Sequence, residues 1–167
     1  MPAFIKILFT TALLTTSVNT TLAQERSDSA AGKPILIQSQ EMIVLVPQSR
    51  EKLMAYSIEK NIWDQIDISV DQKQPIEPTV AQGMTACQLR QTIYAFAAKG
   101  GFWASLNLPP DFKTRFSIND QIVTVFAKTE TEDRLYVFGA NAASWSGVDL
   151  KTGKLLDVNE QKQDPAN

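Results

Sequence analysis

The sequence contains no histidine and one cysteine, Cys87, among its 167 residues. Without histidine the chain has no imidazole base, no imidazole metal ligand and no His-dependent catalytic triad. A single cysteine forms neither a disulfide within the chain nor a cysteine-rich zinc site. We therefore expect no metal site, no cofactor and no catalytic residue of these kinds. The small and apolar neighbours Thr85, Ala86 and Leu89 favour a buried, inert thiol.

Basic charge is also scarce. Lys and Arg number 16 against 18 Asp and Glu, which gives a formal charge of −2. Proteins that bind nucleic acid usually carry a basic surplus that neutralises phosphates, so no nucleic-acid partner is expected. The 44% apolar and 20% charged residues are typical of a globular domain.

Long hydrophobic runs are missing as well. Lys6 is the only charge in the first 24 residues, the apolar stretch 5–14 surrounds and follows it, and Thr21-Leu22-Ala23 places small residues before Gln24. This pattern predicts a secretory signal peptide over residues 1–23, cut after Ala23, and a secreted or periplasmic protein. Threonine and serine interrupt the run at 10, 11 and 15–17, and no later segment is long enough to span a bilayer, so no stable membrane insertion is expected after cleavage.

The three tryptophans are regularly spaced. Trp63, Trp103 and Trp145 lie 40 and 42 residues apart, and regular spacing of a rare residue indicates repeats. Without gaps, each segment has an aromatic residue seven positions before its tryptophan and Asp or Asn four positions after it. The aromatic residues are Tyr56, Phe96 and Phe138, and the polar ones are Asp67, Asn107 and Asp149. The predicted domain covers 34–158, with units at about 34–70, 71–110 and 111–158, between mobile segments at 24–33 and 159–167.

The third copy indicates the secondary structure. Two β-branched and aromatic runs, 122–126 and 135–138, surround the polar residues 128–133, which is typical of a hairpin. Because repeats share a fold, the helical periodicity within 86–97 is misleading, and each unit is expected to be a four-stranded antiparallel sheet. Both alternating faces of 93–98 are apolar, which predicts that this sheet packs between two neighbours.

Sheets stacked in this way are found in β-propellers. The spacing from Tyr94-Ala95-Phe96 to Trp103 resembles the kelch repeat of that fold, across about residues 34–150. The Gly-Gly doublet of kelch blades is replaced by Pro47-Gln48, Gln88-Leu89 and Ala127-Lys128. The segment 149–154 is similar to a turn of quinoprotein-type propeller repeats. These resemblances imply an all-β, propeller-blade-like fold that serves either as a binding platform or as an enzyme.

Three units are fewer than the four to eight blades of a typical propeller. Two chains could pair as a homodimer of six blades, residues 155–158 could add a strand, or the chain could instead form a β-trefoil with three-fold closure. In the first two options a single chain forms blades that do not close into a ring by themselves. In the third option a single chain closes by itself and stays a monomer.

Each recurring residue has a structural and a functional interpretation. The set Tyr56, Trp63, Phe96, Trp103, Phe138 and Trp145 is expected to form the repeat core, and its alternative role is a stacking platform for sugars. Asp67, Asn107 and Asp149 are weak candidates for a binding site, and the simpler expectation is that each accepts hydrogen bonds from the turn that follows.

Carboxylate pairs for glycoside hydrolysis are available among Asp64, Asp67, Asp111, Glu130 and Asp149, as in any chain of this length. The interpretation is an exported, non-catalytic binding or scaffold protein with a protein or carbohydrate partner. The alternative is a small exported carbohydrate-active enzyme or lectin-like module.

Overall fold

The computed structural model describes residues 33–68 and 75–158, and within them the chain is all-β, with thirteen strands and no helix. Sheet 1 contains β1 (Ile35–Gln38), β2 (Met42–Val46), β3 (Lys52–Ser57) and β4 (Ile62–Asp67). Sheet 2 contains β5 (Thr79–Val80), β6 (Met84–Leu89), β7 (Thr92–Ala97) and β8 (Phe102–Asn107). Sheet 3 contains β9 (Lys113–Ile118), β10 (Ile122–Lys128), β11 (Asp133–Gly139), β12 (Ser146–Asp149) and β13 (Leu155–Leu156). The expected signal peptide, most of the expected N-terminal segment and the C-terminal segment lie outside the described residues.

Each sheet is an antiparallel meander whose strands pair in chain order. The expected unit of four strands is confirmed for sheets 1 and 2, and the helical periodicity within 86–97 belongs to two paired strands, β6 and β7. Sheet 3 gains a fifth strand, β13, which pairs with β12 and comes from the segment expected to add a strand.

Strand pairing in the described residues stays within each sheet. A closed barrel requires hydrogen-bonded strands all the way round, and therefore pairing between units. The described chain consequently has three separate stacked sheets rather than the closed barrel of a β-trefoil.

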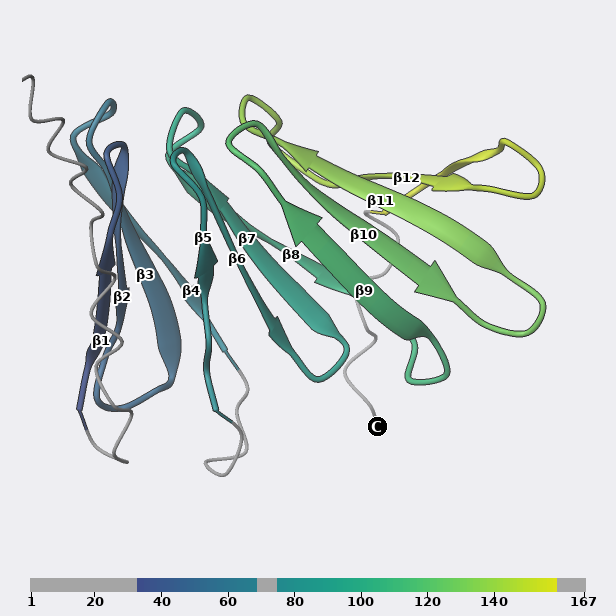
Figure 1. Cartoon of the computed structure of the whole chain (residues 1–167), viewed down its shortest axis with the longest axis horizontal. Coiled ribbons are helices and arrows are strands. Elements are labelled where there is room, and N and C mark those ends of the chain that lie inside the picture. The colour runs from purple at the N-terminus through teal and green to yellow at the C-terminus, as the bar shows by residue number, and fades with distance from the viewer. Residues whose placement is uncertain (1–32, 69–74, 159–167) are drawn as a thin grey trace, which may run out of the picture.

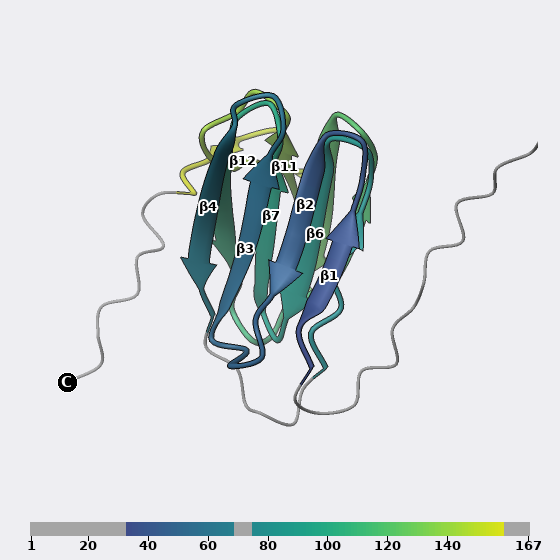
Figure 2. The same cartoon turned by 90° about the vertical axis from the view of Figure 1, so that its left-hand side faces the viewer.

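The three sheets stack face to face. Figure 1 shows them side by side, each tilted further in the same sense than the one before. Figure 2, turned by 90°, shows β2 and β3 in front of β6 and β7, so equivalent strands lie behind one another. The stack has two internal contacts, one on each side of sheet 2.

Two apolar layers fill those contacts. The first joins Val44, Leu53 and Ala55 of sheet 1 to Phe96 and Trp103 of sheet 2. The second joins the other side of sheet 2 to sheet 3 and includes the fully buried residues Met84, Ile93, Leu106, Val123 and Phe138. Strand β7 is buried at five of its six positions, because both of its faces are covered. The expectation that this sheet packs between two neighbours is confirmed.

Candidate functional site

The repeated aromatic pairs define one side of each sheet, which we call its front face, and the opposite side is its back face. Residues paired across antiparallel strands share a face. Tyr56 is paired with Trp63, and Phe96 with Trp103, in register. The ring centroids of these pairs are 5.3 and 5.4 Å apart, and those of Phe138 and Trp145 are also 5.4 Å apart. The three pairs are therefore structurally equivalent.

Burial of the tryptophans is not equivalent. Trp103 and Trp145 are 8% and 4% exposed, as expected for core residues, whereas Trp63 is 50% exposed. The expectation that Trp63 is a buried core residue is wrong. The physical reason is its position, because the front faces of sheets 2 and 3 are covered by the preceding sheet, and sheet 1 has no preceding sheet in the described chain.

The front face of sheet 1 is apolar and uncovered. Its exposed or half-buried apolar side chains come from all four strands and are Leu36, Ile43, Leu45, Met54, Tyr56 and Trp63. Leu36 is 63% exposed. The hydroxyl of Tyr56 donates a hydrogen bond to Asn61 Oδ1 in the β3–β4 turn, which orients this ring beside Trp63.

The back face of sheet 3 is the second uncovered apolar surface. Its apolar side chains, also exposed or half-buried, are Ile122, Phe126, Leu135, Val137, Val148 and Leu155. Phe126 is 48% exposed and Leu155 is 79% exposed. Contiguous exposed apolar patches of this kind mark interaction sites on soluble proteins.

Polar contacts fix the stacking of sheets 1 and 2. The buried Ser57 Oγ donates to the backbone oxygen of Ala98 at 2.6 Å. Asp64 Oδ2 accepts the backbone N–H of Trp103 at 2.7 Å. These contacts were not predicted from the sequence, because Ala97 and Gly139 replace Ser57, and Ala104 and Ser146 replace Asp64, in the other units.

The three weak binding candidates occupy equivalent positions in different sheets. Asp149 Oδ1 accepts the backbone N–H groups of Lys151 and Thr152 and the Thr152 hydroxyl at 2.7 to 2.9 Å. These hydrogen bonds, with that of the Thr152 backbone first, lower the pKa of Asp149. Asn107 Oδ1 accepts the hydroxyl of Thr92 at 2.8 Å, and Asp67 lies opposite Lys52 in register. The turn-capping expectation is thus confirmed for Asp149, and the structure does not bring the three residues into a shared site.

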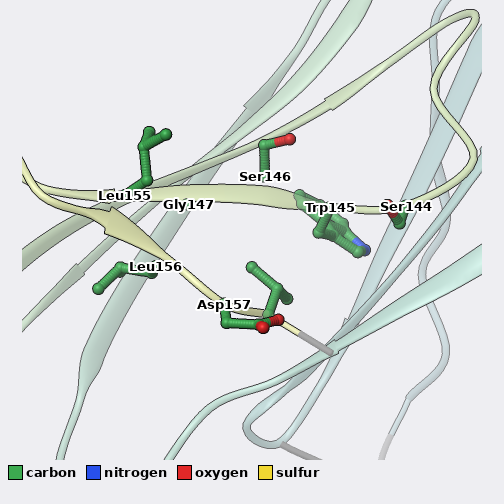
Figure 3. A pocket seen from close by; sticks show the side chains of 8 residues that line it. Ser144, Trp145, Ser146, Gly147, Leu155, Leu156 and Asp157 are labelled. Atoms are coloured by element: carbon green, nitrogen blue, oxygen red, sulfur yellow. The ribbon is translucent and has the colours of Figure 1, made fainter. Parts of the chain in front are cut away.

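A hollow of about 460 Å³ lies beside β12 and β13. Figure 3 shows the side chains of Trp145, Ser146, Leu156 and Asp157 around it. Among its described lining residues Asp157 is the only carboxylate, so these residues do not provide the pair that glycoside hydrolysis requires. Within the described part of the chain the buried indole N–H of Trp145 has no hydrogen-bond partner, but neither has that of the equivalent Trp103, which does not line the hollow. The unpaired N–H groups therefore follow from the repeat rather than from a ligand site.

The candidate carboxylates are spread over the stack. Asp64 contacts sheet 2, Asp149 ends β12 of sheet 3, and Asp111 and Glu130 are exposed in two further connections. In residues 33–68 and 75–158, no three acidic or cysteine side chains gather closely enough to hold a metal ion. Over the same residues no helix is long and apolar enough to cross a membrane.

Cys87 lies at the contact between sheets 1 and 2. It is fully buried, as its neighbours indicated, and is not part of a disulfide. Burial is the main cause that raises the pKa of this thiol to about 11. A thiol with a raised pKa is a poor nucleophile at neutral pH, so Cys87 acts as a packing residue.

Comparisons with known proteins do not extend these observations. No protein-family model matches the sequence, and no curated protein matches it closely enough to indicate a relationship.

Proposed function

We propose that the chain is an exported, non-catalytic binding or scaffold protein built from propeller-type repeats, and that its two outer sheet faces bind protein. The observation that carries this proposal is the pair of uncovered apolar faces at the ends of the stack. Leu36 and Trp63 lie on one face and Phe126 and Leu155 on the other, all at least 48% exposed. Apolar sheet faces of this kind gain free energy when another protein surface removes them from water.

A photo-crosslinking amino acid at position 36 tests the proposal in the cell of origin. Position 58 is a matched control, because Ile58 is also apolar and 46% exposed but lies in the β3–β4 turn. We expect a protein adduct from position 36 and none from position 58. Absence of any protein adduct from position 36 in the folded chain would contradict protein binding at this face.

Export is tested separately by N-terminal sequencing of the chain outside the cytoplasm. The spacing of Thr21-Leu22-Ala23 predicts a mature protein that begins at Gln24. A membrane-bound product that keeps Met1 would contradict cleavage.

The exposed pair Tyr56 and Trp63 favours a second candidate, a lectin-like module. Aromatic faces stack on apolar sugar surfaces, and this pair is the one in the described chain that another sheet does not cover. Titration of soluble oligosaccharides against tryptophan fluorescence distinguishes the candidates. A saturable change that disappears in Trp63→Ala, together with no adduct from position 36, would support sugar binding instead of protein binding.

A further inference from the structure

Within the stack, the back face of one sheet covers the front face of the next, and this happens twice. The back face of sheet 1, with Leu53 and Ala55, covers Phe96 and Trp103 of sheet 2. The back face of sheet 2 covers Phe138 and Trp145 of sheet 3, where Phe102 contacts Phe138 edge to face at 6.3 Å. The strands that approach most closely differ between the two contacts: β4 lies against β8 between sheets 1 and 2, whereas β6 lies against β9 and β10 between sheets 2 and 3.

In β11 and β12 the uncovered back face of sheet 3 carries the residue types of the two covering faces, whereas β9 has Arg115 and Ser117 where β1 has Ile35 and Ile37. Leu135 stands at the position of Leu53 and Ile93, and Val148 stands at the position of Ile66 and Leu106. Leu53, Ile93 and Leu106 are fully buried against the next sheet. Leu135 and Val148 thus present the same apolar surface with no fourth sheet in the described chain to cover it.

The uncovered front face of sheet 1 matches the two covered front faces in the same way. Trp63 stands at the position of Trp103 and Trp145, and Tyr56 stands at the position of Phe96 and Phe138. In both internal contacts the partner of such a front face is a back face of this chain.

We infer that each uncovered face binds a second copy of this chain, with the back face of sheet 3 of one protomer on the front face of sheet 1 of its partner. This inference rests on the proposed protein-binding function. A single head-to-tail contact leaves two faces open, whereas two such contacts related by a two-fold axis leave none. The product is a closed dimer of six sheets, a number within the range of closed propellers.

Charge on the rims is compatible with this contact. The front face of sheet 1 carries Lys52 opposite Asp67, and the back face of sheet 3 carries Lys128 opposite Asp133. Lys128 and Asp133 form an ion pair at 3.3 Å. Both pairs lie where the third strand of the unit begins. The back face of sheet 3 also carries Lys113 and Arg115, which pair in register with Lys128 and Phe126, so its strands have a positive surplus. Lys52 and Asp67 balance each other on the front face of sheet 1, so no net positive charge opposes this surplus.

The area also suits a stable dimer. Four strands about 4.8 Å apart, each with about six residues that rise about 3.3 Å, make a face of roughly 350 Å². Two contacts, each covering two such faces, bury roughly 1,400 Å², which lies within the range of about 1,200 to 2,000 Å² for specific interfaces.

The mass of the exported chain in solution, measured by light scattering or sedimentation over a range of concentrations, tests the inference. We expect twice the mass of one chain at micromolar concentration. Leu36→Lys and Phe126→Lys each place a charge in the contact and should weaken association roughly 100-fold. Ile58→Lys is the matched control and should remain dimeric. The replaced side chains are 63%, 48% and 46% exposed within one chain, so each protomer should keep its fold, which circular dichroism checks.

Mixing the two defective variants tests the head-to-tail arrangement. Leu36→Lys retains an intact back face and Phe126→Lys an intact front face, so the mixture should form a heterodimer through one good contact. If two front faces bound each other instead, the mixture would form no heterodimer, because the front face of Leu36→Lys is defective. Monomeric wild type at high micromolar concentration, or growth into polymers, would overturn the closed dimer. Adducts from position 36 to a different protein, with a monomeric chain, would overturn the dimer while supporting the proposed function.

Discussion

Trp63 and Trp103 each have an aromatic neighbour at the equivalent position, Tyr56 and Phe96, at 5.3 and 5.4 Å, yet their contributions to stability should differ. Trp103 is 8% exposed within an apolar layer, whereas Trp63 is 50% exposed. In the Phe126→Lys background, which should weaken the inferred association, Trp103→Ala should lower the free energy of unfolding by roughly 3 to 5 kcal/mol. Trp63→Ala should cost about 1 kcal/mol or less, because a half-exposed side chain leaves little cavity. Urea unfolding measures both, and equal losses would contradict the assignment of sheet 1 as an uncovered end.

Asp149 is the residue with a pH-dependent role in turn formation. Its hydrogen bonds from Thr152 and Lys151 lower the pKa of its carboxyl group. A lowered pKa in the folded state means that the contribution to stability is present above the pKa of the unfolded chain and is lost as pH falls through the folded pKa. Thr152→Val should raise the pKa of Asp149 toward its ordinary value, which a carbon-detected NMR titration reads directly. An unchanged pKa in Thr152→Val would show that the backbone N–H groups alone set it.

At the scale of elements, one side-chain hydrogen bond joins β4 to β8 beside their apolar packing. Asp64 is the acceptor for the N–H of Trp103 at 2.7 Å, on the edge of sheet 2. Asp64→Ala leaves that half-buried N–H without a partner and should cost roughly 1 to 3 kcal/mol. Asp64→Asn keeps an oxygen acceptor and should cost less. The midpoints of urea unfolding compare the two variants, and an equal loss in both would mean that the negative charge, rather than the hydrogen bond, stabilises the contact.

The positions of the strands could largely be predicted from the pattern of β-branched and aromatic residues. The stacking of the sheets could be predicted only in part. The alternation in β10 and β11 predicted a hairpin, and the repeat extended that prediction to 86–97, where local periodicity indicated a helix. The exposure of equivalent side chains was harder to predict. Trp63 and Trp103 share a sequence context, and only the position of their sheets in the stack decides which one water reaches. The hydrogen bonds of Ser57 and Asp64 could not be predicted from the repeat either, because a contact made in only one unit leaves no repeated pattern in the sequence.

The buried thiol of Cys87 should make stability at high pH depend on the contact between sheets 1 and 2. Burial raises the pKa of its thiol to about 11. Because the folded state holds this proton more tightly than the unfolded chain, the contribution of the thiol to stability is complete below the unfolded pKa and is lost as pH rises toward 11. Between about pH 9 and 11 the free energy of unfolding should therefore fall by about 2 kcal/mol more in the wild type than in Cys87→Ala. Parallel pH profiles for the two proteins would contradict a buried, protonated thiol.

At the scale of the whole molecule, three stacked sheets always leave two faces without a neighbour. Among residues 33–68 and 75–158, sheet 2 is buried on both sides, while sheets 1 and 3 are each buried on one side only. The outer faces carry the same apolar positions as the inner ones, so the repeat itself creates a surface that matches the chain's own opposite end. The inferred association of copies would thus need no interface beyond the two outer faces of the stack.

Mass action makes the stability of any dimer depend on protein concentration. If two chains share their end faces, the unfolding of the dimer depends on protein concentration, and each tenfold increase in concentration should stabilise it by about 1.4 kcal/mol. The urea midpoint of the wild type should therefore rise with concentration, while that of Leu36→Lys, which loses the front-face contact, should stay constant. Because the contact is mainly apolar, 1 M salt should leave the wild-type dependence in place, as salt screens exposed charges and not burial of apolar surface. A wild-type midpoint that is the same over a hundredfold range of concentration would show that the two faces do not meet in solution.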